Sequence, residues 1–141
     1  MNRQQATNPN SPPMHRAGSA TSRSPEGIAS APFWLETLVE AKEDGELAAM
    51  CCSLEPGTVT HWHTHPLGQI LYALSGVGMV QRQGGAIEEM RAGDCVTFAP
   101  GEAHRHGAAP SSTFAYISIQ GRENGSAVTW LRAEIETGGE P

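Results

Sequence analysis

The sequence of 141 residues lacks the features of a membrane, secreted or nucleic-acid-binding protein. No apolar run approaches the ~20 residues of a transmembrane helix, and none supplies the apolar core of a secretory signal peptide. Basic residues are few, with nine Lys and Arg against fifteen Asp and Glu, and they form no cluster that would bind nucleic acid. We therefore expect a cytoplasmic protein without membrane or nucleic-acid partners.

Cysteine is also scarce, with three residues in the chain. Cys51 and Cys52 are adjacent and Cys95 stands alone, so no Cys-x-x-Cys spacing occurs. An odd number of cysteines without that spacing predicts neither a disulfide framework nor a structural zinc ribbon. We expect reduced thiols.

Periodic apolar patterning is missing from the first 32 residues, which hold five of the ten prolines. Such a segment buries too little apolar surface to offset the entropy lost on ordering. We predict a disordered tail over 1–32, one domain over 33–136 and a flexible end over 137–141. The remainder after the tail is acidic, with six basic residues against fourteen acidic ones.

Glycine and proline divide the domain into short runs rich in β-forming residues. Turn chemistry appears at Glu55-Pro56-Gly57 and at Gly84-Gly85, and the longest β-branched and aromatic run covers 113–120. Only 130–136 could be helical. About eight or nine short strands at this spacing predict an all-β sandwich or barrel rather than βαβ units.

Five of the six histidines fall into two short clusters. His61, His63 and His65 occupy alternate positions, and His104 and His106 repeat that spacing later in the chain. Because side chains alternate between the two faces of a strand, residues two apart project to the same side. The sequence therefore predicts a metal site built from imidazole rings.

The residues around these clusters resemble the two motifs of the cupin family. The first motif is similar to the run Gly57-x5-His63-x-His65-x3-Gln69-x6-Gly76, in which glutamine replaces the family's usual glutamate. The second is similar to Gly93-Asp94 followed by Ala99-Pro100-Gly101-x2-His104, with alanine at 99 where proline is usual. This resemblance implies a single conical cupin β-barrel, also called a double-stranded β-helix or jelly roll.

Further strings, at 63–69, 81–89, 100–110 and 119–120, resemble small bacterial cupins that include manganese-dependent hydroxynitrile lyases. That resemblance implies one divalent metal ion, manganese first, and a homo-oligomer, either a dimer or a tetramer. It also implies the metal ligands, which are His63, His65, Gln69 and His104. His106 and Gln120 then fall where that family lines the pocket beside the metal.

The neutral side chain of Gln69 bears on the chemistry. Imidazole nitrogens with a carbonyl oxygen suit manganese, iron, cobalt, nickel or zinc. Replacing a glutamate by Gln69 removes one negative charge from the ligand set, so a divalent ion attracts anionic oxygen more strongly. This favours Lewis-acid chemistry over oxygen activation.

We therefore expect a carbon-carbon lyase that acts on a small cyanohydrin-like substrate. His106 would move the proton and Gln120 would orient the oxygen. The substrate pocket is predicted to involve Met50, Cys52, Phe98 and Tyr116. Two alternatives stay open, a metal-dependent dioxygenase or isomerase and a non-catalytic ligand-binding cupin, because this family uses one site for many chemistries.

Overall fold

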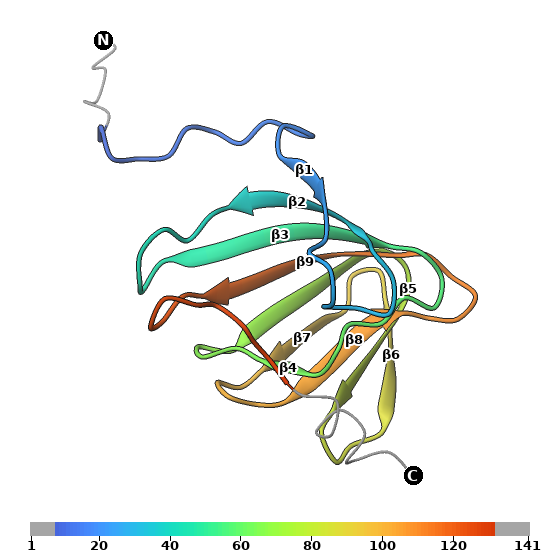
Figure 1. Ribbon diagram of the computed structural model, residues 1–141. Coiled ribbons are helices and arrows are strands. Elements are labelled where there is room, and N and C mark those ends of the chain that lie inside the picture. The colour runs from blue at the N-terminus through green and yellow to red at the C-terminus, as the bar shows by residue number, and fades with distance from the viewer. Residues whose placement is uncertain (1–7, 132–141) are drawn as a thin grey trace.

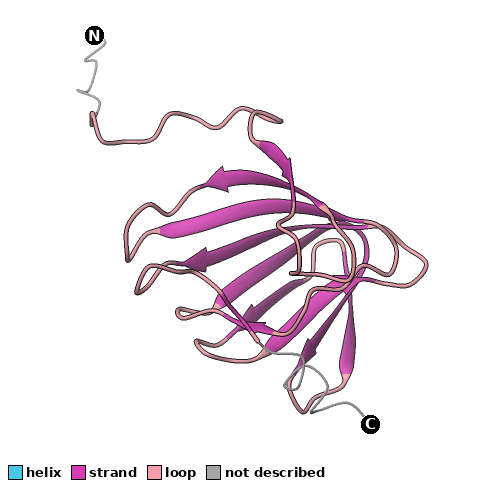
Figure 2. Cartoon of the chain, viewed as in Figure 1, coloured by secondary structure: helices cyan, strands magenta, loops and turns pink. Residues whose placement is uncertain are grey.

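The computed structural model describes residues 8–131. The regular secondary structure assigned in that range consists of β-strands alone. Figure 2 shows these strands joined by loops and turns. The strands are β1 (Thr21–Arg23), β2 (Trp34–Val39), β3 (Leu47–Leu54), β4 (His63–Thr64), β5 (Gln69–Arg82), β6 (Ile87–Arg91), β7 (Cys95–Phe98), β8 (His104–Ala108), β9 (Phe114–Gly121) and β10 (Thr129–Trp130). Within 8–131 no helix is long and apolar enough to cross a membrane. The predicted all-β class is confirmed.

The strands form one antiparallel sheet in the order β1-β2-β3-β9-β5-β8-β4-β10, with β6 and β7 also paired to β5. Figure 1 shows this sheet curled around an interior. The first half of the long strand β5 pairs with β7 and β9, and its second half pairs with β6 and β8. The predicted barrel is therefore a curled half-barrel whose two walls share β5.

Two glycines let β5 pass from one wall to the other. The pairing register with β9 shifts just before Gly76, which has a φ of 75°. A Cβ atom on Gly76 would overlap the carbonyl oxygen of Thr113, and one on Gly78 would overlap the ring of Phe114. Larger side chains at these positions would force β5 away from β9.

The inward side chains change character along β9. Phe114 and Tyr116 are buried in the apolar core, whereas Ser118 and Gln120 are buried polar residues. Apolar packing therefore fills the part of the barrel around the start of β9. Polar side chains are left to line the other part, around the end of β9.

Part of the predicted disordered tail over 1–32 has a described structure, and residues 1–7 of it lie outside the described residues. Residues 8–32 are described, and β1 pairs with the edge strand β2. Ser24 N–H donates to the Phe33 carbonyl over 2.8 Å, and Ile28 and Ala29 pack against the core. Its backbone groups thus pair with β2 and with residues 59–61 instead of being left without partners. The predicted end at 137–141 and most of the helical candidate at 130–136 lie outside the described residues, while Trp130 belongs to β10.

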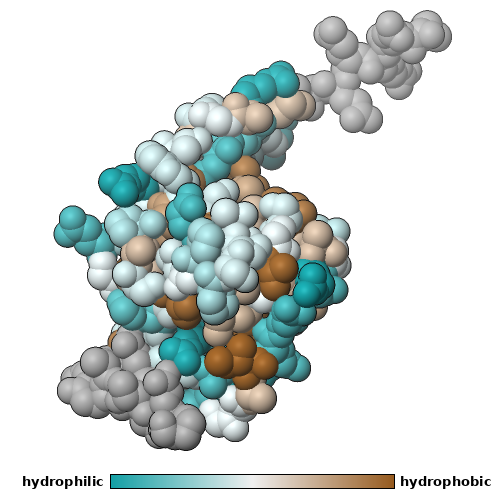
Figure 3. Space-filling model, turned by 90° about the vertical axis from the view of Figure 1, so that its right-hand side faces the viewer, coloured by the Kyte–Doolittle hydropathy of each residue, from teal (hydrophilic) through white to brown (hydrophobic). Residues whose placement is uncertain are grey.

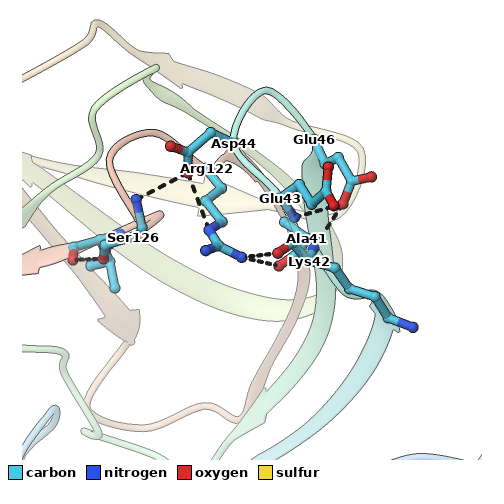
Figure 4. Close-up of polar contacts among 9 residues, drawn as sticks. Ala41, Lys42, Glu43, Asp44, Glu46, Arg122 and Ser126 are labelled. Atoms are coloured by element: carbon cyan, nitrogen blue, oxygen red, sulfur yellow. Dashed lines mark hydrogen bonds and ion pairs between the residues drawn. The ribbon is translucent and has the colours of Figure 1, made fainter.

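A polar clamp joins the loop between β2 and β3 to the loop after β9 (Figure 4). The Arg122 guanidinium donates to the carbonyl oxygens of Lys42 and Ala41 and forms an ion pair with Asp44 over 3.3 Å. Asp44 also accepts a hydrogen bond from Gly125 N–H at 3.0 Å. These contacts fix the start of the loop between β9 and β10.

Candidate metal centre

Six predicted site residues converge in the polar part of the barrel, and each is at most 5% exposed. His63 lies in β4, His65 follows it, Gln69 begins β5, His104 and His106 lie in β8, and Gln120 lies in β9. Strand pairing explains the convergence, because the β4–β8 register sets His63 opposite His104. The β5–β9 register sets Gln69 opposite Gln120.

Three of the histidine rings are fixed by backbone carbonyls. Each donates its Nδ1–H to one carbonyl oxygen, and the pairs are His63 to His61 (2.7 Å), His65 to Ala127 (2.6 Å) and His104 to Glu102 (2.9 Å). A carbonyl only accepts hydrogen bonds, so Nδ1 carries the proton and the neutral ring keeps a lone pair on Nε2. That tautomer is the one in which Nε2 binds a metal.

Burial keeps these rings neutral. It is the largest cause that lowers the pKa of His63, His65 and His104, since a charged imidazolium would lose its hydration. The pKa of His63 lies well below its ordinary value, and that of His104 falls to about 4. All three are therefore in the metal-binding protonation state at neutral pH.

The positions of the candidate metal-binding atoms fit a cation. The Gln69 side chain donates its amide N–H to Gln120 Oε1 at 3.1 Å, which turns Gln69 Oε1 toward His104 Nε2 at 2.9 Å. Both facing atoms are acceptors, so their lone pairs repel unless both point at one cation. Ligands bound at right angles about 2.1 Å from one ion lie about 3.0 Å apart. His65 Nε2 is also buried without a hydrogen-bond partner among the described residues.

A buried three-histidine cluster surrounds this point. One nitrogen each from His63, His104 and His106 lies within 4.8 Å of the other two, a grouping that suits a metal ion. The ring of His65 lies 5.0 Å from that of His63 and 5.4 Å from that of His104. The predicted ligands are thus assembled together with His106. The ring of His61 is outside this cluster, and its carbonyl holds His63 instead.

His106 is connected differently from the other three rings. Its Nε2 lies 3.0 Å from the Tyr116 hydroxyl. Burial raises the pKa of Tyr116 well above its ordinary value and that of Cys52 to about 12, so both groups stay protonated. The other ring nitrogen, His106 Nδ1, has no hydrogen-bond partner among the described residues.

A cavity of about 430 Å³ lies beside these groups. Its polar lining includes His63, His65, Gln69, His106 and Gln120, and its apolar lining includes Phe33, Leu35, Met50, Cys52 and Tyr116. Phe98 was predicted to line the pocket, but it is not among the residues that line this cavity. It stacks on His104, with ring centroids 3.6 Å apart and an angle of 9° between the planes. The end of β7 thus packs against the predicted ligand His104.

Several cavity residues were not predicted from the sequence. Ser22, Arg23, Pro25 and Ile28 line it from the segment that was expected to be disordered. Trp130 lines it from β10, with its ring 4.7 Å from that of His63. No local pattern marked these positions, because they reach the site through pairing between distant parts of the chain.

Comparison with known proteins agrees with this geometry. The family described as "Cupin domain" matches residues 50–119. The chain is 43% identical over 117 residues to (R)-mandelonitrile lyase from Granulicella tundricola, a match that covers 82% of this chain and 89% of that protein.

Solved structures agree on the fold. A cupin-like protein from Thermotoga maritima superposes with a TM-score of 0.74 at 28% identity, covering 89% of this chain and 97% of that one. The polyketide cyclase RemF from Streptomyces resistomycificus superposes with a TM-score of 0.69 at 18% identity, covering 90% and 91%, and supports the fold alone. The half-barrel, the histidine cluster and these relatives together show that the chain belongs to the cupin family.

Proposed function

We propose that this protein is a metal-dependent hydroxynitrile lyase, which cleaves a cyanohydrin to a carbonyl compound and hydrogen cyanide. The observation that carries the proposal is the uncharged donor set, in which Gln69 Oε1 faces His104 Nε2 beside the cavity. The 43% identity to (R)-mandelonitrile lyase supports the same reaction.

The proposed ligands are Nε2 of three histidines and Oε1 of one glutamine, namely His63, His65, His104 and Gln69. His106 stays outside this set in the proposal, because its Nε2 is engaged by the Tyr116 hydroxyl. We propose Mn²⁺ as the ion, with Fe²⁺, Zn²⁺, Ni²⁺ and Co²⁺ as ions that the same donors accept. A bound divalent ion supplies a Lewis acid that stabilises negative charge on oxygen or cyanide.

The protein's own groups handle the proton. His106 Nδ1 faces no protein partner among the described residues, so it accepts the proton of the substrate hydroxyl. In that tautomer His106 Nε2–H donates to the Tyr116 oxygen. The carbon-carbon bond then breaks, its electron pair leaves with cyanide, and His106 returns the proton to form hydrogen cyanide.

Gln120 has a positioning role in this proposal. Its Oε1 accepts the amide hydrogen of Gln69 over 3.1 Å, and its own amide is 3.5 Å from the Ala48 carbonyl. Gln120 therefore fixes which atom of Gln69 faces His104. Its position in the cavity lining also lets it contact the substrate oxygen.

One assay panel separates the three candidate functions. Purified protein loaded with Mn²⁺ should release benzaldehyde and cyanide from mandelonitrile. Oxygen uptake by the iron-loaded protein, without cyanide release, would favour the dioxygenase alternative. Metal binding without turnover of cyanohydrins or oxygenase substrates would contradict the lyase and favour a binding protein.

A further inference from the structure

The end of β1 and the chain that joins it to β2 form one side of the cavity. We call residues 22–33 the N-terminal strap. Figure 1 shows the chain after β1 running across the curled sheet before it returns to β2. The strap contributes Ser22, Arg23, Pro25, Ile28 and Phe33 to the cavity lining.

The strap is held to the segment that leads into the metal site. His61 N–H donates to the Ile28 carbonyl at 2.9 Å, and Ala29 forms a β-bridge with Thr60. Ser30 N–H donates to the Val59 carbonyl at 2.8 Å, and Val59 N–H donates to the Ser30 hydroxyl oxygen at 3.0 Å. Because 59–61 directly precede the proposed ligands, the strap has a fixed position relative to them.

The strap's own two ends are also joined. Ser24 is 8% exposed, and its hydroxyl accepts the Phe33 N–H at 3.0 Å while its N–H donates to the Phe33 carbonyl at 2.8 Å. These paired bonds close the strap into a loop over the cavity. The loop therefore forms a wall of the cavity in this structure.

The strap lines the cavity with the polar residues Ser22 and Arg23 and with an apolar part formed by Pro25, Ile28 and Phe33. Ile28 and Phe33 pack with Leu35 and Met50 against the core. The guanidinium of Arg23 lies 5.7 Å from the centre of the Trp34 ring, which holds this cation against an aromatic face. The cavity thus combines a polar side of histidine and glutamine with an apolar side that includes the strap.

We infer that the strap forms the subsite for the apolar substituent of the cyanohydrin, and that Ile28 sets the size of that substituent. This inference rests on the proposed function. With the hydroxyl and nitrile at the polar side, the remaining group of the substrate lies against Ile28. The substrate class is then a cyanohydrin of an aromatic or similarly bulky apolar aldehyde.

Two substitutions at Ile28 test the size of the subsite. We would measure kcat/KM for the cyanohydrins of 2-naphthaldehyde and benzaldehyde. Ile28→Ala should raise the naphthyl-to-phenyl ratio by about tenfold, and Ile28→Trp should lower it by about tenfold, since apolar pockets discriminate by filled volume. Ile87→Ala is the control, because Ile87 is 53% exposed on β6 and does not line the cavity.

A second measurement works without turnover. Dissociation constants of 2-naphthaldehyde and benzaldehyde, followed by NMR on the metal-loaded protein, should show the same opposite shifts. If the unmodified protein cleaves neither cyanohydrin, the proposed lyase function fails while these constants still test the strap. If Ile28→Ala does not fold, Ile28→Val and Ile28→Trp give the comparison. Ratios unchanged within about twofold in folded variants would overturn the inference.

Discussion

At the scale of single residues, Gln69 determines the charge of the proposed ligand set. Its amide is oriented by Gln120, so its oxygen rather than its nitrogen faces His104. The three histidines are neutral because burial lowers their pKa values. A divalent ion held by four neutral ligands keeps its full charge for the substrate.

Gln69→Glu tests this charge argument. The carboxylate should hold metal at least as tightly but lower kcat for cyanohydrin cleavage by about tenfold or more, because it weakens the attraction of the ion for anionic oxygen. Metal content and kcat are measured on the same sample. Gln83→Glu, at an exposed position of the β5–β6 hairpin, should change neither. An unaltered kcat in Gln69→Glu would refute the charge argument.

Tyr116→Phe tests the link between His106 and the core. The substitution keeps the buried ring and removes the hydroxyl that lies 3.0 Å from His106 Nε2. We expect kcat to fall about tenfold or more with KM and metal content nearly unchanged, because His106 loses the partner of one ring nitrogen. Nitrogen NMR of the imidazole should report a changed tautomer. Unchanged kcat and an unchanged spectrum would exclude a role for the Tyr116 hydroxyl in orienting His106.

At the scale of elements, the bend in β5 brings the two walls of the barrel together. Gly76 and Gly78 both lie within β5, and the contacts that require glycine there come from the start of β9 and the residue before it. Thr113 and Phe114 occupy the space that a Cβ atom would need. The spacing of the motif in sequence marks Gly76, and only the fold shows which contact requires glycine there.

Gly76→Ala and Gly84→Ala separate backbone strain from overlap. Both glycines have positive φ, 75° and 80°, but a Cβ on Gly84 meets no atom within 4 Å. Gly84→Ala should cost about 1 kcal/mol of unfolding free energy, and Gly76→Ala about 3 kcal/mol or more. Urea unfolding measures both. Equal losses would mean that β5 relaxes away from Thr113 without penalty.

The elements also show what sequence reasoning can reach. His63, His65 and His104 stood out because motif spacing and strand alternation are local properties. The strap was missed because 28–30 are held by residues 59–61, which are distant in sequence. Phe98 was assigned to the pocket because alternation alone does not reveal that it stacks on His104.

At the scale of the whole molecule, outward positions on β5 carry exposed apolar side chains. Ile70, Tyr72 and Leu74 are 40%, 44% and 41% exposed. On the side shown in Figure 3, hydrophobic residues form separate patches among hydrophilic ones. We propose the β5 surface as the contact between copies in a homo-oligomer, since such patches mark interfaces. Light scattering of the purified protein measures its mass directly, and a monomer would refute the contact.

Acid should destabilise the metal-free protein. Buried histidines have lower pKa values in the folded chain than in the unfolded chain, so the unfolded state binds more protons as the pH drops. Their contribution to the free energy of unfolding is complete above about pH 6.5, the ordinary pKa of histidine. It is lost as the pH falls toward the pKa of each ring in the folded chain, which is about 4 for His104. Over that pH range, each such ring lowers the free energy of unfolding by about 1.4 kcal/mol for every pH unit.

Urea unfolding of the metal-free protein at pH 7.5 and pH 5 checks this slope. His104→Gln should weaken the pH dependence of the free energy of unfolding by about the contribution of one histidine. His61→Gln is the control, because the ring of His61 lies outside the buried cluster. Equal stability of the unsubstituted protein at both pH values would contradict the assignment of neutral buried rings.

The most direct measurement of the central claim is cyanohydrin cleavage before and after metal removal. The protein is stripped with a chelator at neutral pH, assayed with mandelonitrile, and assayed again after Mn²⁺ is added back. We predict that cleavage is lost with the metal and returns with it, while the β-sheet circular dichroism spectrum is retained throughout. Full activity in a preparation shown by elemental analysis to contain no metal would contradict a metal-dependent lyase.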